Sequence, residues 1–95
     1  MALLNQSEIN EALATLKGWE AKDNFLFKNF EFDNFKSAVA FTVKIALAAE
    51  VHNHHPDILI HGWNKVMVKL STHSENGITG KDIKLANEIQ NLFGD

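Results

Sequence analysis

The chain has 95 residues, a formal net charge of −3 and a pI of about 5.9, and its nine basic residues are scattered along the sequence. Because there is no basic block, the sequence argues against binding to nucleic acid or to an anionic membrane surface and favours a small-molecule partner. It contains no cysteine, which excludes disulfides, thiolate chemistry and Cys-ligated metal centres.

Residues 1–95 are predicted to form a single domain, because the sequence holds no repeat, no low-complexity stretch and no linker. A hydrophobic content of 45% is sufficient for a core. The N-terminal stretch "MALLNQSEIN" has neither a basic segment nor an apolar run long enough for a signal peptide or a membrane span. A cytoplasmic protein is therefore expected.

The first expected elements are a helix and a β-hairpin. The helix is predicted over about residues 7–16, with Ser7 as its N-cap and apolar residues at near-helical spacing. Residues 19–32 ("WEAKDNFLFKNFEF") then alternate between aromatic and polar around Asp23 and Asn24, a pair typical of turns. This alternation predicts two antiparallel strands.

A long helix is predicted over residues 34–52, with Asp33 available to cap it. Its apolar side chains cover more than one stripe, and a helix that is apolar nearly all round requires burial on two sides. One side is expected to pack on a sheet and the other on a second subunit, although a fully internal helix would fit the same pattern. Pro56 prevents the helix from continuing and biases His55 toward an extended conformation.

A second hairpin is predicted where "DILIH" and "KVMVKLSTH" flank a turn at Gly62, Trp63 and Asn64. The alternation places His73 at the end of a strand, on the less apolar face. The residues expected on the apolar face are Val66, Val68, Leu70 and Thr72.

The last predicted element is a helix that follows a turn at Asn76 and Gly77 and begins with a capping box formed by Thr79 and Asp82. Its inner side is expected to carry Ile83, Leu85, Ala86, Ile89 and Leu92. The element order is therefore α-ββ-α-ββ-α. It predicts an α+β fold in which helices cover one face of a four-stranded antiparallel sheet.

Three of the five histidines lie in "EVHNHHPDIL", residues 50–59. No metal site is expected, because the side chains of the adjacent residues His54 and His55 diverge. Tetrahedral ligation would need further ligands from distant parts of the sequence. His52, near the end of a helix, is expected only to favour the helix dipole. For His54, His55 and His73, spacing alone supports a structural role and acid–base catalysis about equally, since imidazole has a pKa of about 6.5.

Three segments in order, "AAEVHNHHPDI", "NKVMVKLSTH" and "GITGKDIKLANEI", resemble the pterin-4a-carbinolamine dehydratase family. The resemblance covers nearly the whole chain and includes "GWE" and the Phe-rich hairpin. It implies a cofactor-free enzyme that removes water from 4a-hydroxytetrahydropterins, the pterin products of aromatic amino-acid hydroxylases, to give quinonoid dihydropterin.

The resemblance also implies roles for individual residues. His54, His55 and His73 would be the catalytic group, and which of them is acid and which is base stays open. The residues expected to line the pterin are Asn53, His54, His55, Ser71, Thr72, His73 and Ser74. Glu50 and Asp82 fall where the family has acidic residues near the site. Asp82 would either orient the His73 imidazole or only close the capping box with Thr79. Glu50 would either support the site or be a solvated helix residue.

The resemblance also bears on the protein partners of this chain. The resemblance suggests a homo-oligomer, either a dimer or a tetramer. Animal members serve as dimerisation cofactors for a homeodomain transcription factor, so a non-enzymatic binding role is the alternative to catalysis.

One segment departs from the family pattern. "DILIHGW" has seven residues where the pattern usually has six, and Ile58 stands where the family has tryptophan. Because a strand with one apolar face cannot slip by one residue, the insertion is expected at the hairpin tip. Gly62 is predicted to have a positive φ there, Trp63 to supply aromatic surface, and His61 to be a bystander.

Overall fold

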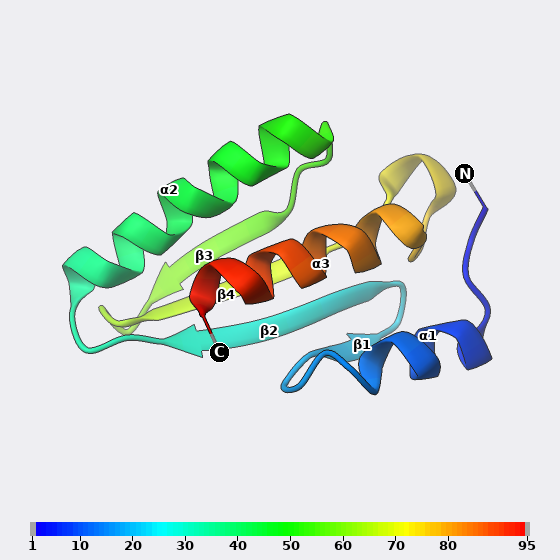
Figure 1. Cartoon of the computed structure of the whole chain (residues 1–95), viewed down its shortest axis with the longest axis horizontal. Coiled ribbons are helices and arrows are strands. Elements are labelled where there is room, and N and C mark those ends of the chain that lie inside the picture. The colour runs from blue at the N-terminus through cyan, green and yellow to red at the C-terminus, as the bar shows by residue number, and fades with distance from the viewer. Residues whose placement is uncertain (1, 95) are drawn as a thin grey trace.

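The computed structural model describes residues 2–94 and has the predicted order α-ββ-α-ββ-α, with one additional short 3-10 helix (Figure 1). The elements are α1 (Gln6–Leu13), β1 (Glu20–Lys22), β2 (Phe25–Glu31), α2 (Phe35–His52), β3 (Asp57–His61), β4 (Lys65–Leu70), η1 (His73–Glu75) and α3 (Gly80–Phe93).

The four strands form one antiparallel sheet in the order β1-β2-β4-β3. Both predicted hairpins are present, and β4 joins them by pairing with β2 and with β3. One face of the sheet is apolar and packs into the core beneath α2 and α3, while α1 lies beside β1 (Figure 1). The buried residues on this face include Leu26, Phe30, Val66, Val68 and Leu70. The predicted α+β fold class is confirmed.

The start of α1 differs from the prediction that Ser7 caps a helix over residues 7–16. The N-cap is Asn5, whose Oδ1 accepts a hydrogen bond of 2.8 Å from the Glu8 N–H. The Glu8 carboxylate in turn accepts a bond of 2.9 Å from the Asn5 N–H, which completes a capping box. Ser7 has Asn10 at the equivalent position and lacks this reciprocal bond. The helix ends at Leu13, before a short turn.

The N-cap of α2 is Asn34 and not Asp33, because the Asn34 side chain accepts a bond of 2.7 Å from the Ser37 N–H. The helix then runs for 18 residues and buries Ala38, Phe41, Ile45 and Ala49 against the core. In the described part of the chain, no helix is both long enough and apolar enough to cross a membrane.

The tip of the second hairpin has the positive φ predicted for Gly62. His61 pairs with Lys65, and between them Gly62 and Trp63 have φ values of 56° and 61°. Glycine adopts this left-handed region without steric cost. The Trp63 side chain is largely exposed at the tip.

The prediction that His73 ends a strand is wrong. β4 ends at Leu70, because its pairing with β2 stops at the pair of Leu26 and Leu70 and its pairing with β3 stops one residue earlier, at Asp57 and Lys69. Thr72 instead bridges to Gly77 across a tight turn, and His73 lies in η1 inside that turn. The side chain of Thr72 is nevertheless buried on the apolar side, as the alternation predicted.

Candidate active site

One cavity brings together the residues that the resemblance placed around the pterin. Its volume is about 280 Å³, and it lies where the end of α2, the segment after β4 and the start of α3 meet at one end of the molecule (Figure 1). The lining consists of Asn53, His54, His55, Ser71, Thr72, His73, Ser74 and Lys81. Only Lys81 was not expected from the sequence.

The chain reverses at the end of α2 because Asn53 adopts the left-handed conformation, with φ 50° and ψ 44°. The Asn53 N–H donates to the Glu50 carbonyl at 3.2 Å, and the His54 N–H donates to the Ala49 carbonyl at 3.1 Å. These bonds satisfy carbonyls at the helix end and fix the backbone next to the two histidines. The His54 side chain then reaches α3, while that of His55 returns to Glu50.

His54 is anchored to a fully buried carboxylate. Its Nε2 lies 2.5 Å from Oδ1 of Asp82, whose side chain is 0% exposed. The other oxygen, Oδ2, accepts a bond of 2.8 Å from the Thr72 hydroxyl and one of 2.9 Å from the Thr79 N–H. The Thr72 and Thr79 hydroxyls also lie 2.7 Å apart. Because the Asp82 carboxylate is held by the Thr72 hydroxyl and the Thr79 N–H, it accepts a hydrogen bond from His54 in a fixed position, and the Nε2–H of His54 is directed toward it.

The other nitrogen of His54 is thereby left for the cavity. Nδ1 has no hydrogen bond to the described residues, and no polar side-chain atom among them is both buried and unsatisfied. In neutral imidazole the nitrogen that is not protonated carries the lone pair. The Asp82 contact therefore presents Nδ1 of His54 as a proton acceptor.

The expectation that Asp82 orients His73 is wrong, since Asp82 contacts His54. The cause is the position of His73, which lies in η1 with an exposed side chain, beyond the end of β4. The predicted capping box between Thr79 and Asp82 is present, so Asp82 both caps α3 and binds an imidazole.

His55 has a weaker anchor than His54. Its Nε2 lies 2.7 Å from Oε2 of Glu50, but both side chains are mostly exposed, at 63% and 75%. His73 lines the same cavity with no side-chain hydrogen bond to the described residues. The cavity therefore holds one imidazole fixed by a buried acid and two imidazoles open to solvent.

Two features of the site had no signal of their own in the sequence. Lys81 reaches the cavity because it directly precedes Asp82 in the first turn of α3. Thr72 was expected to line the pterin, but its hydrogen bond to Asp82 depends on the approach of two segments that are separate in sequence. Within residues 2–94, no three His, Asp or Glu side chains are grouped closely enough to hold a metal ion. That the protein needs neither metal nor cofactor stays a prediction.

Known proteins match this chain over a range that includes every residue of the site. Residues 2–92 match the family described as pterin 4 alpha carbinolamine dehydratase. A protein of Roseiflexus castenholzii that is provisionally named as such a dehydratase is 48% identical, over 97% of this chain and 98% of its own length. A protein of Sulfurisphaera tokodaii with the same provisional name is 46% identical, over 98% of this chain and 99% of its own length.

Two solved structures share the fold. The transcriptional coactivator/pterin dehydratase from Brucella melitensis is 41% identical, with a TM-score of 0.92 over 98% of this chain and 100% of that one. A pterin dehydratase-like protein, a RuBisCO assembly factor in the alpha-carboxysome, is 24% identical with a TM-score of 0.67, over 81% of this chain and 88% of that one, and is similar in fold alone. With a family match across 2–92 and relatives of similar length, this chain belongs to the pterin-4a-carbinolamine dehydratase family.

Proposed function

We propose that this protein dehydrates 4a-hydroxytetrahydropterins to quinonoid dihydropterins by histidine acid–base catalysis. The observation that carries the proposal is the position of His54, His55 and His73 around one cavity, in a chain of this family. The substrate would come from aromatic amino-acid hydroxylases, and the product would be ready for reduction back to the tetrahydropterin.

The reaction needs only two proton transfers. The bond between C4a and the hydroxyl oxygen breaks, and that oxygen takes a proton and leaves as water. The adjacent ring nitrogen loses a proton, and its electron pair forms the new double bond to C4a. No electrons are gained or lost overall, so one proton donor and one proton acceptor suffice, each contributing on the order of 10²–10⁴-fold to the rate.

The anchoring of the imidazoles suggests how these steps are divided. His54, with Nδ1 free and Nε2 bound to Asp82, takes the proton from the ring nitrogen, and the carboxylate then stabilises the imidazolium. His55 or His73, both exposed to solvent, delivers the proton to the departing hydroxyl.

A comparison of two histidine variants tests whether activity resides in this cavity. His73→Ala is expected to lower turnover at least tenfold, because His73 lines the cavity. His61→Ala is expected to keep near-normal turnover, because His61 lies on β3 at the far end of the hairpin and bonds Asn29 at 2.9 Å. Turnover of both variants would be measured under the same conditions. An equally severe loss at His61 would show that the inserted residue has changed the position of the active site.

The protein is also proposed to form a homo-oligomer, a dimer or a tetramer, through the outer side of α2. Opposite the buried residues of this helix, Val43, Leu47 and Val51 are spaced four residues apart and lie on one side. Leu47 is 65% exposed and Val51 is 84% exposed. Large apolar side chains aligned on a helix favour a protein partner, and a second copy of α2 would cover them symmetrically.

Sedimentation at micromolar concentration tests this assembly. The wild-type protein is expected to sediment as an oligomer, and Leu47→Glu to shift it toward the monomer by placing a charge in the interface. Asn91→Glu introduces the same change in charge at an exposed position on α3 and is expected to leave the assembly intact. A monomeric wild-type protein would contradict the proposal.

A non-enzymatic binding role is the second candidate, because the related Brucella protein is named both as a coactivator and as a dehydratase. The apolar side of α2 would suit such a role as well as self-association. Turnover by the purified protein separates the two functions, since a pure binding module has no reason to accelerate the dehydration.

A further inference from the structure

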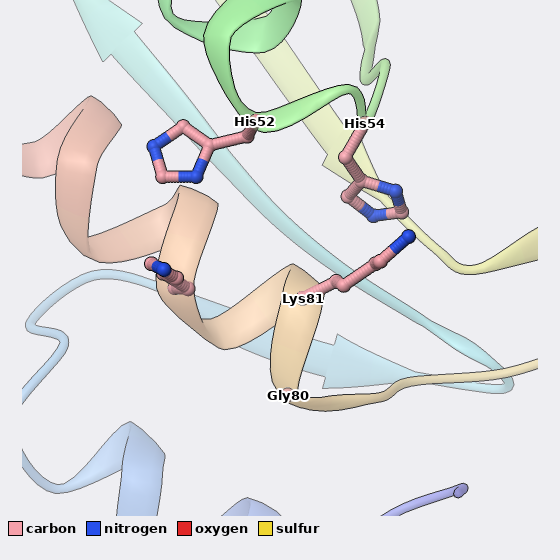
Figure 2. Close-up of a pocket in the computed structure, with 5 residues that line it drawn as sticks. His52, His54, Gly80 and Lys81 are labelled. Atoms are coloured by element: carbon pink, nitrogen blue, oxygen red, sulfur yellow. The ribbon is translucent and has the colours of Figure 1, made fainter. Parts of the chain in front are cut away.

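A second cavity adjoins the first. Its volume is about 230 Å³, and its lining consists of His52, His54, Gly80, Lys81 and Lys84 (Figure 2). Figure 2 shows His52 and His54 projecting from the end of α2 and the following turn toward the start of α3, with Lys81 extended beside the His54 ring. His54 and Lys81 line both cavities, so the two spaces share a wall.

The lining of this second cavity contains cationic and imidazole groups and no acid. Among the described residues, neither Lys81 nor Lys84 forms an ion pair. The carboxylate nearest His54 is Asp82, which is buried and already accepts three bonds. The one facing His52 is Glu88, at 3.5 Å and outside the lining. Two uncompensated ammonium groups therefore border one cavity.

This charge does not follow from the composition, because the chain has twelve acidic and nine basic residues. A concave site bordered by two lysines without ion pairs favours an anion, since charge-assisted hydrogen bonds to phosphate or carboxylate are stronger than neutral ones. Lys84 borders only the second cavity, whereas Lys81 borders both.

We propose that the second cavity binds an anionic group, a phosphate or a carboxylate, on the side chain of the pterin whose ring occupies the first cavity. This inference rests on the proposed function. In a pterin, the ring nitrogen that loses its proton is bonded to the carbon that carries the side chain. A substrate that reacts at His54 therefore begins its side chain close to His54, which lines both cavities, and Lys84 and Lys81 border the second one.

The binding of two ligands that differ only in the anion tests the proposal. Dihydroneopterin and dihydroneopterin phosphate share ring and side chain, and both lack the 4a-hydroxyl group, so neither is turned over. Calorimetry at low salt is expected to show the phosphate form binding about tenfold more tightly to the wild-type protein. The preference should shrink as salt is added.

Two variants with the same loss of charge locate the effect. Lys84→Gln is expected to bring the ratio of the two affinities close to one, because it removes an ammonium group from the second cavity alone. Lys22→Gln, at an exposed position on β1 and outside both cavities, is expected to keep the wild-type ratio. Circular dichroism would confirm that both variants keep the fold.

The outcomes separate this inference from the proposed function. Equal affinity of the wild-type protein for the two ligands would overturn the inference while leaving pterin binding intact. Inorganic phosphate alone is expected to compete weakly with the phosphate form; binding as tight as that of the phosphopterin would show a site for a free anion and overturn the proposal. Failure of both pterins to bind would overturn the proposed function itself.

Discussion

Replacement of His54 by alanine is expected to lower the turnover of 4a-hydroxytetrahydropterin by about 10²–10⁴-fold. The reason is its position: His54 lines the cavity, and its Nε2 is bound to the buried Asp82 carboxylate, which leaves Nδ1 without a hydrogen bond to the described residues and able to accept a proton. His55→Ala, at an imidazole held only by an exposed glutamate, is expected to lower turnover at least tenfold. Turnover and the circular dichroism spectrum would be measured on the same preparations.

His54→Gln serves as the matched variant, because a glutamine amide can donate a hydrogen bond toward Asp82 but does not accept a proton near neutral pH. If His54 exchanges a proton, the glutamine variant keeps wild-type thermal stability and remains as inactive as the alanine variant. If the loss of turnover only follows a loss of helical signal, and glutamine restores both, His54 is structural.

Replacement of Asp82 is expected to have two large effects that depend on the substituent. Asp82→Ala should lower the free energy of unfolding by about 3 kcal/mol, because it removes the α3 capping contact and leaves the Thr72 hydroxyl and the Thr79 N–H without their acceptor. Thermal or urea unfolding measures this change. A variant as stable as the wild-type protein would contradict the proposed contribution of the buried network.

Asp82→Asn preserves the shape of the side chain and tests the orientation of His54. If the amide oxygen continues to accept from the Thr79 N–H, the amide NH₂ faces His54 and donates to Nε2. The proton of the imidazole then moves to Nδ1, and the lone pair is withdrawn from the cavity. Turnover is expected to fall by about 10²-fold or more, with a smaller loss of stability than for the alanine variant.

Glu88→Gln is the control for Asp82→Asn, because Glu88 also faces a histidine but at 3.5 Å and with partial exposure. It is expected to leave the turnover of a neutral pterin close to that of the wild-type protein. Equal effects of the two substitutions would mean that general electrostatics, and not the orientation of His54, sets the rate.

The fold could be predicted well from the sequence because its main signals are local. The capping box of Thr79 and Asp82 and the turns at Asn24 and Gly62 each depend on a few adjacent residues, and all are present in the structure. The first N-caps were misplaced by one or two residues, because Asn5 and Asn34 compete with neighbouring polar side chains of similar propensity.

The site was less predictable because its contacts join distant segments. The resemblance identified seven residues that the structure gathers around one cavity, but it could not say which imidazole meets Asp82. That depends on where β4 stops: the apolar alternation continues to Thr72, whereas strand pairing ends at Leu70 and moves His73 into a turn. Strand ends follow from neighbouring strands, which the alternation of one strand does not encode.

The central claim is that three imidazoles around one cavity make this protein a dehydratase, and the rate of dehydration by the purified wild-type protein tests it most directly. The 4a-hydroxytetrahydropterin would be generated in solution and its conversion to quinonoid dihydropterin followed by absorbance. We predict an acceleration of at least about 10²-fold over the uncatalysed reaction, lost when His54 is replaced. A folded wild-type protein that leaves the uncatalysed rate unchanged would contradict the account.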